Sequence, residues 1–526
     1  MKFQRVRLAV LFVALSVVVS GCDASSVLGL KLQRAGSRCA GSGFARDAAN
    51  VLQCKRGRWV VVMPIGRAIA LIDTYNASQA TPAGAPVTTP PVAVPAETTA
   101  PPAAPPTTPP MTPTTPLPAT TISTSTTTTT STTTTTATTT PPASLSPRIL
   151  AIAAGGEHTC ALKFDRTVHC FGSNQFGQLG NSNLGIVPNP TPIPVVGLSG
   201  ITALAAGGSH TCALKNDGTV HCFGSNSNGQ LGNSNNIDPS PSANPTPAVV
   251  PGLNNVTAVA AGSNYTCALK NDGTVHCFGG NYFGQLGNGA HFFFSSPTPA
   301  PTRVLGLSNI TAITAGGLHT CALRSDGTVH CFGNNTFGQL GNALYNGQVI
   351  GQSTPVAVAG LTNVTAIASG SRHTCALKLD GTVDCFGSNE SGALGNTTSI
   401  ETPDPTPFPA TVYGLTNITA ITTGGYHTCA LSNDGTMHCF GDNYSGQLGN
   451  STNIGYDIER PKANPTPTPV DGLTNIAAMA GGGFHTCGLK IDGTVHCFGN
   501  NRSGELGRST NNGANIANPL PVPVSW

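Results

Sequence analysis

Charged side chains are scarce in this chain. Asp, Glu, Lys and Arg make up only 9% of its 526 residues, and the formal net charge is +3. No basic stripe occurs in its repeated part, so the electrostatic footprint of a nucleic-acid-binding protein is missing. We therefore expect no nucleic-acid partner.

Motifs that carry chemistry are also missing. The sequence has no nucleophile elbow, no P-loop and no dinucleotide-binding fingerprint between a strand and a helix. No Asp/Glu pair stands out as an acid/base couple, because most aspartates of the repeats occur in Asp-Gly turns. We expect no catalytic residues, no cofactor and no enzymatic activity.

What the chain does contain is a repeat. The stretch from Ala205 to Asn233 occurs seven times with small changes, and its two cysteines, Cys212 and Cys222, recur in every copy. The first cysteines of successive copies lie 52 to 58 residues apart. A period of this length is typical of stacked supersecondary units, none of which can bury its apolar face alone.

Each copy predicts a β-hairpin. Its turn is the three-residue loop 216–218, in which Gly218 takes the left-handed position and Lys215 pairs with Thr219. Counting outward from this turn places Cys212 opposite Cys222. Side chains two residues apart share a face of a strand, so one face of the hairpin carries Cys212, Leu214, Val220 and Cys222.

Two further short strands are expected in each unit. In one copy they are 247–250, where a proline suits an edge position, and 256–260. Four strands are the size of one blade of a β-propeller. The glycines of the Gly-Gln-Leu-Gly element, such as Gly229 and Gly232, mark a tight turn.

The pattern A-G-G-x-H-T-C-A-L, D-G-T-V, F-G-x-N and G-Q-L-G resembles the repeat of the regulator of chromosome condensation family. The resemblance covers residues 147–526 and implies an all-β, seven-bladed β-propeller. This chain departs from the family at three places in the repeat. Phe stands where many members have Trp, Tyr265 replaces the first His of its copy, and Asp384 replaces the second His.

The first 27 residues predict export. Basic residues precede an apolar run over 8–19, which is too short to span a bilayer and has the build of a signal peptide. The sequence from Val19 to Cys22 resembles a bacterial lipobox. Residues 1–21 are then the signal peptide, and residues 22–27 are the lipid-anchored N-terminus, with the lipid on Cys22. An ordinary signal peptide with an incidental cysteine is the alternative. We expect an exported protein, lipid-anchored on the extracytoplasmic side of a bacterial membrane or secreted.

Two regions separate this segment from the repeats. Residues 28–75 contain Cys39, Cys54 and a predicted strand at 59–62, and they indicate a small β module that needs a disulfide because it has fewer than 50 residues. Residues 76–146 are almost entirely Thr, Pro, Ala and Ser. Such a composition has too few apolar residues to offset the conformational entropy that the chain loses on folding, so we expect a disordered linker.

One lipidated cysteine and eight pairs account for all 17 cysteines of the sequence. Cys22 takes the lipid, and the other sixteen form pairs, as expected of an oxidising compartment. Zinc held by residues such as His210, Cys212 and Cys222, or free thiols, are the alternatives. The predicted disulfides are Cys39–Cys54, Cys160–Cys170, Cys212–Cys222, Cys267–Cys277, Cys321–Cys331, Cys375–Cys385, Cys429–Cys439 and Cys487–Cys497.

Candidate partner-binding residues lie where the copies differ, after the Gly-Gln-Leu-Gly element. Insertions in a repeat protein map to one face, and these segments have no obvious packing role. Packing against the edge of the blade is the alternative for the three phenylalanines. The candidates are Phe292, Phe293, Phe294, Asp457, Glu459, Arg460 and Lys462.

These observations favour a monomeric, membrane-anchored scaffold that binds an extracytoplasmic protein or a cell-wall component through its loops. The resemblance implies two alternatives. One is guanine-nucleotide exchange on a small GTPase, which export would separate from its substrate. The other is inhibition of an enzyme such as a β-lactamase, although Trp526 is the only Trp in the repeats. We also expect the C-terminal strand, 519–524, to dock into the first blade and close the ring.

Overall fold

The structure is a computed structural model. It describes residues 148–237, 243–290, 297–344, 351–455, 462–514 and 516–526, and the backbone of three strands between 44 and 64. The chain divides into two compact units, 1–131 and 132–526, which we describe separately. None of the described residues belongs to a helix long and apolar enough to cross a membrane.

The described strands of the first unit form an antiparallel sheet in the order β1-β2-β3. They are β1 (Phe44–Arg46), β2 (Asn50–Lys55) and β3 (Arg58–Pro64). The strand predicted at 59–62 lies within β3. Cys39, Cys22 and the linker 76–146 lie outside the described residues, and the side chain of Cys54 is not described, so the Cys39–Cys54 disulfide stays a prediction.

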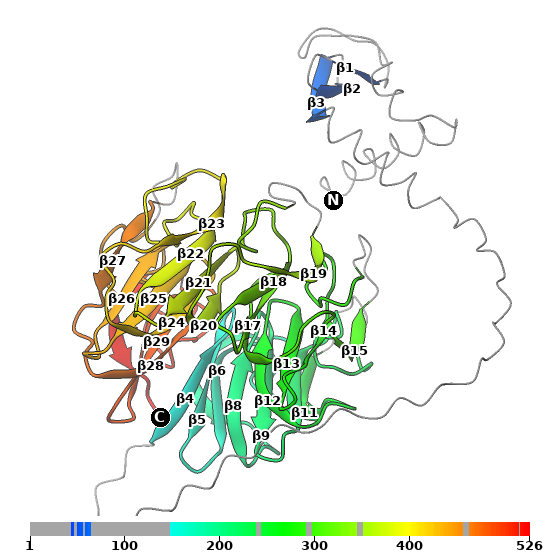
Figure 1. Cartoon of the computed structure of the whole chain (residues 1–526). Helices are drawn as coiled ribbons and strands as arrows, with labels where there is room; N and C mark the ends of the chain where they lie inside the picture. Colours follow the sequence, from blue (N-terminus) through cyan, green and yellow to red (C-terminus); the bar gives the residue numbers. More distant parts are fainter. Residues whose placement is uncertain are drawn as a thin grey trace, which may run out of the picture. The chain divides into compact units, whose positions relative to one another are not determined.

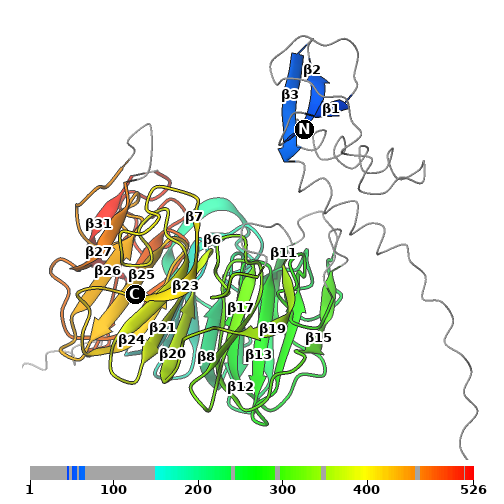
Figure 2. The same ribbon diagram turned by 45° about the horizontal axis from the view of Figure 1, so that its top comes forward.

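The second unit is a seven-bladed propeller whose sheets are arranged around a common axis (Figures 1 and 2). Each blade is a four-stranded antiparallel sheet with its strands in chain order. Blades 1 to 3 consist of β4 (Ile149–Ala154), β5 (His158–Lys163), β6 (Val168–Asn174), β7 (Gly185–Pro194); β8 (Ile201–Ala206), β9 (His210–Lys215), β10 (Val220–Ser225), β11 (Ala243–Val249); and β12 (Val256–Ala261), β13 (Tyr265–Lys270), β14 (Val275–Gly279), β15 (Thr298–Arg303).

The remaining blades repeat this plan. Blades 4 to 7 consist of β16 (Ile310–Ala315), β17 (His319–Arg324), β18 (Val329–Gly333), β19 (Gln352–Ala357); β20 (Val364–Ser369), β21 (His373–Lys378), β22 (Val383–Ser388), β23 (Pro405–Thr411); β24 (Ile418–Thr423), β25 (His427–Ser432), β26 (Met437–Gly441), β27 (Asn464–Pro469); and β28 (Ile476–Gly481), β29 (His485–Lys490), β30 (Val495–Gly499), β31 (Asn518–Pro523).

The connections of a four-stranded meander lie alternately at its two ends, so the propeller has two distinct faces. The glycine face carries the short loops after the first strands, such as 207–209, and the loops between the third and fourth strands, such as the one that begins at 226–237. The Asp-Gly face carries the hairpin turns, such as 216–218, and the connections from blade to blade. Of the predicted candidate residues, only Lys462 is described, and it lies in the glycine-face loop before β27.

The hairpin register is the predicted one. Leu214 lies opposite Val220, and Cys212 lies opposite Cys222 with the Cα atoms 4.1 Å apart. All seven hairpins of the propeller carry the corresponding disulfide, and all fourteen of these cysteines are buried. The seven predicted disulfides of the propeller are therefore present, and they leave no thiolate for the zinc alternative.

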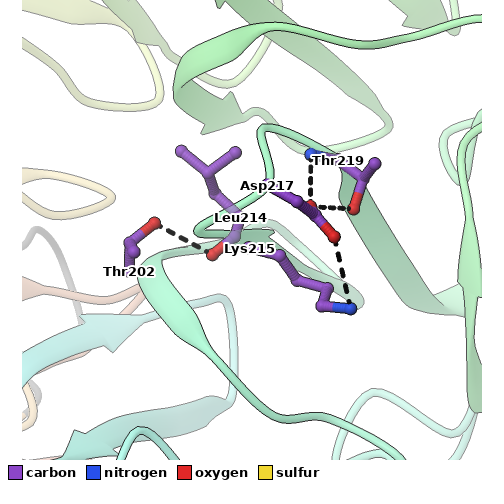
Figure 3. A network of polar contacts seen from close by, with 5 residues as sticks. All are labelled: Thr202, Leu214, Lys215, Asp217 and Thr219. Carbon is purple, nitrogen blue, oxygen red and sulfur yellow. Dashed lines mark hydrogen bonds and ion pairs between the residues drawn. The ribbon is translucent and has the colours of Figure 1, made fainter.

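The repeated aspartate shapes the hairpin turn (Figure 3). Asp217 Oδ1 accepts hydrogen bonds from the backbone N–H and the hydroxyl of Thr219, at 2.9 and 2.6 Å. The adjacent Gly218 has a φ of 77°, a conformation that costs glycine no strain. Lys215 Nζ lies 3.5 Å from the other carboxylate oxygen. This repeated carboxylate therefore serves the turn, as the sequence predicts.

The hydrophobic core is distributed over the seams between blades. In one seam, the Cys212–Cys222 disulfide and Leu231 of blade 2 pack against Phe278 of blade 3. The same arrangement occurs at every seam, and the seven phenylalanines that replace the Trp of many relatives are completely buried. The repeated phenylalanine therefore joins each blade to the preceding one.

The expected strand exchange at the ring closure is wrong. The C-terminal strand β31 pairs with β30 inside blade 7, and blade 1 has its own fourth strand, β7. The Pro-rich strand therefore belongs to the repeat it follows, and no blade lacks a strand. The ring closes through packing instead: Val524 and Leu506 pack with Phe171 of blade 1, and β28 lies beside β4 (Figure 1).

Proline protects the outer edges of the blades. In blade 7, the backbone N–H of Val524 donates inward to the carbonyl of Val495 at 2.8 Å. Alternation along the strand then directs the nitrogens of Pro523 and Pro521 outward, where a proline has no hydrogen to offer. An edge with missing donors pairs poorly with a further strand, so the outer rim disfavours binding by strand addition.

Candidate functional site

The glycine face has a hollow at its centre, of about 110 Å³, lined by the ends of the first strands and by the glycine pairs, which are Gly-Ser in blades 3 and 5. Backbone hydrogen bonds run around it from blade to blade. Gly156 N donates to the carbonyl of Gly207 at 3.0 Å, and Gly208 N donates to that of Gly262 at 3.2 Å. At the seam of blades 7 and 1, Gly483 N donates to the carbonyl of Gly155 at 2.9 Å, and six of the seven seams have such a bond.

A ring of buried side-chain hydrogen bonds lies against the glycine pairs. His210 Nε2 is 2.9 Å from Thr266 Oγ1 of the next blade, and His485 of blade 7 reaches Thr159 of blade 1 at the same distance. Six of the seven seams have this His–Thr pair. The repeated histidine is therefore a structural link between blades, as the sequence predicts.

The threonine fixes the tautomer of the histidine. Thr266 has one hydroxyl hydrogen, which it donates to the carbonyl of Gln230 at 2.9 Å. His210 Nε2 must therefore donate to Thr266 and carry the proton. This leaves His210 Nδ1 buried with no hydrogen-bond partner among the described residues. Burial lowers the pKa of His210 to about 3, so this ring is neutral at physiological pH.

Glycine is required beside each histidine ring. A Cβ atom on Gly207 would lie 2.3 Å from His210 Cε1 and 2.5 Å from the carbonyl oxygen of Gly262. Real Cβ atoms do not approach other atoms so closely. The first glycine of the Gly-Gly-x-His sequence is therefore explained by the packing of the histidine ring on the backbone.

The two departures from the repeat are structural as well. Tyr265, in place of histidine, donates its hydroxyl to the backbone carbonyl of His319 and still links blade 3 to blade 4. Asp384, in place of the second histidine, accepts a hydrogen bond from Thr411 at 2.8 Å and lies 3.1 Å from Lys378 Nζ. Neither departure creates a group poised for chemistry.

Amides hold the loops of the glycine face. Asn226 Oδ1 accepts from the backbone N–H of Leu231 at 2.9 Å, and Gln230 Oε1 accepts from that of Asn228 at 2.8 Å. In blade 7 the glutamine is replaced by Glu505, whose side chain accepts from the backbone N–H of Ser503 at 2.7 Å. Burial raises the pKa of Glu505 to about 7.

The structure only partly places the predicted partner-binding residues. Phe292, Phe293, Phe294, Asp457, Glu459 and Arg460 lie outside the described residues. Lys462 is described and exposed, and its backbone carbonyl accepts a hydrogen bond from Asn464 at 3.2 Å. These residues therefore stay predictions.

A second set of candidate residues was not predicted from the sequence. The residue between the glycine pair and the following histidine or tyrosine differs in every copy, although its neighbours hardly change. That contrast is the signal that could have found it. The second residue of each pair, a glycine in five blades and Ser263 or Ser371 in the other two, lines the central hollow, so the next residue stands around it. In chain order, these residues are Glu157, Ser209, Asn264, Leu318, Arg372, Tyr426 and Phe484.

The chain matches two models of a known family, both described as the regulator of chromosome condensation (RCC1) repeat. One matches seven segments: 149–178, 201–230, 256–285, 310–339, 364–393, 418–447 and 476–505. The other matches six: 166–214, 217–269, 272–323, 326–377, 380–431 and 434–489.

Relatives match most of the propeller. The ultraviolet-B receptor UVR8 of Arabidopsis thaliana is 27% identical over 68% of this chain and 79% of the receptor. Protein pim1 of Schizosaccharomyces pombe is 30% identical over 65% of this chain and 68% of pim1. The crystal structure of Prp20p from Saccharomyces cerevisiae covers 72% of this chain and 88% of Prp20p, with a TM-score of 0.58 and 22% identity, a likeness of fold.

Proposed function

This chain belongs to the regulator of chromosome condensation repeat family, and from that premise we propose that it is a scaffold that binds a protein partner through its glycine face. Its task is recognition and not catalysis. The propeller holds the binding residues in place, and the partner contacts the loops and the residues around the central hollow. Binding residues on the loops of a rigid scaffold are a common solution in proteins.

This proposal rests on the difference in role between the repeated polar side chains and the residues that vary between blades. Within the repeat, the buried histidines bind threonines of the next blade, the amides hold the loops, and the aspartates shape the turns. These side chains have structural tasks. The residues that differ from blade to blade are concentrated on the glycine face, where they have fewer such tasks.

A relative supports the class of partner. Prp20p of Saccharomyces cerevisiae has binding properties to Gsp1p and to histones, which are proteins. We take from this only that a propeller of this family can bind proteins. No feature of the described residues favours nucleotide exchange or enzyme inhibition in this chain.

We propose that the scaffold works outside the cytosol, anchored by a lipid on Cys22. The signal-peptide-like segment and the lipobox-like residues before Cys22 support this location. The seven propeller disulfides also support it, because disulfides persist in oxidising compartments. Replacement Cys22→Ser should move the protein from the membrane fraction to the soluble fraction. If the variant and the wild type fractionate alike, Cys22 is not the anchor.

Site-specific photo-crosslinking tests the binding face. A benzophenone amino acid is placed at Ser234 on the glycine face or, as the matched control, at Asn216 on the Asp-Gly face; both are exposed. After irradiation of the producing cells, we expect a crosslinked protein with the probe at Ser234 and none with the probe at Asn216. The reverse pattern would contradict the proposal.

A further inference from the structure

The residues around the hollow are not alike on its two sides. Blades 1 to 3 contribute polar side chains, whereas blades 4 to 7 contribute apolar, aromatic and cationic ones. On the second side, four side chains from four consecutive blades form a row, which we call the aromatic row: Phe337, Arg372, Tyr426 and Phe484.

The aromatic row is continuous. The guanidinium carbon of Arg372 lies 4.6 Å from the ring centre of Phe337 and 5.7 Å from that of Tyr426. The rings of Tyr426 and Phe484 follow, with their centres 6.2 Å apart and their planes inclined by 36°. Phe484 is 40% exposed, so this end of the row offers an apolar surface to a partner.

Two aromatic rings hold the guanidinium of Arg372, but no carboxylate of the described residues neutralises its charge. Within the described residues, its guanidinium forms no ion pair and no hydrogen bond, whereas Arg324 and Lys378 lie within 4 Å of aspartates. A guanidinium carries five N–H donors in a rigid fork that matches a carboxylate. Contact with two rings limits its freedom before binding, which lowers the entropic cost of the complex.

The chemistry of the row restricts its occupant. A single guanidinium among aromatic rings suits one carboxylate, whereas a nucleic acid requires many cations. The rings suit an apolar side chain next to that carboxylate, and aromatic residues and Arg are enriched at the centres of protein interfaces. The proline-protected rims disfavour strand addition. We propose that the aromatic row binds a protein segment that presents an Asp or Glu carboxylate to Arg372 beside an apolar side chain.

This inference rests on the proposed function and locates its centre, and peptide selection on the full chain tests it. A phage library of random 12-residue peptides is the probe. We expect enriched peptides to contain Asp or Glu next to an apolar residue. Replacement Arg372→Ala should weaken their binding at least tenfold without changing the melting temperature. The matched control is Arg502→Ala, an exposed arginine of the same face, which should change affinity less than twofold.

A double-mutant cycle isolates the contact. Replacing the peptide's acidic residue by its amide should weaken binding to the wild type at least tenfold and binding to Arg372→Ala less than twofold. Equal losses on both proteins would overturn the proposal, as would peptides that bind Arg372→Ala as tightly as the wild type. In either case, peptides that crosslink to a probe at Ser234 would still support the proposal that the glycine face binds a partner. If no peptide is enriched on the chain, the proposal for the aromatic row fails, and crosslinking at Ser234 decides the scaffold function separately.

Discussion

Single buried groups set how this protein responds to acid. The pKa values of His158 and His373 are lowered to about 4, and those of the other four buried histidines to about 3, with burial as the largest cause. Each ring donates through Nε2. A second proton would have to bind at Nδ1 and would place a positive charge in the buried core. The unfolded chain binds these protons near pH 6.5, so acid favours unfolding.

Thermal unfolding should therefore depend on pH. The histidine contribution is complete above pH 6.5 and is lost as the pH falls toward the folded values of about 3 to 4. Each histidine adds up to about 1.4 kcal/mol per pH unit in that window. Calorimetry should show a nearly constant melting temperature between pH 7.5 and 6.5 and a steady fall from pH 6.5 to pH 4. A constant melting temperature down to pH 4.5 would contradict the account of the histidine ring.

Glu505 has the opposite dependence. It is 2% exposed, and its pKa is raised to about 7, so its stabilising protonated form is lost as the pH rises. Replacement Glu505→Gln restores the residue of most other blades and should stabilise the protein by about 3 kcal/mol at pH 8 and by almost nothing at pH 4. Chemical denaturation at both pH values measures the difference; a gain independent of pH would rule out titration of Glu505 as its cause.

At the scale of the element, each blade is secured by its own disulfide. The two cysteines of a hairpin are separated by 10 residues, and a loop of this length contributes roughly 2–3 kcal/mol in the chain-entropy model. Replacing both Cys212 and Cys222 by Ser should lower the free energy of unfolding by that amount. Mass spectrometry without reduction should detect no free thiol among residues 148–526. Fourteen free thiols with bound zinc would overturn this assignment.

The elements also show what the sequence could and could not predict. The turn at Gly218 fixed the hairpin register, so the pairing of Cys212 with Cys222 followed by counting. The assignment of the fourth strand did not follow, because a periodic sequence does not say whether the Pro-rich strand begins one repeat or ends the previous one. The burial of Phe278 in the preceding blade depends on contacts between repeats, which the pattern within one repeat does not contain.

The candidate site was less predictable than the fold. The variable loops predicted which face carries the site. The aromatic row was not predicted, because its residues, such as Phe337 and Arg372, come from four different blades and are distant in the sequence. Only the closed ring brings them together. Inside the repeat, the variable position before each histidine was the available signal.

The whole molecule depends on closure of the ring through side chains. Val524 is 6% exposed at the seam of blades 7 and 1, and Val250 is 1% exposed at an internal seam. If the ring is closed, Val524→Ala and Val250→Ala should destabilise the protein to a similar extent, by about 1–3 kcal/mol each. Denaturant melts compare them. A negligible effect of Val524→Ala beside a large effect of Val250→Ala would indicate an open seam.

The central claim is that the glycine face binds the partner while the repeated residues maintain the propeller. Hydrogen–deuterium exchange of the full chain, alone and with the partner recovered by crosslinking, tests it most directly. We predict that the partner slows exchange in glycine-face loops such as 226–237 and 389–402 and leaves the hairpin turns unchanged. Protection confined to the Asp-Gly turns, such as 216–218, would contradict the claim.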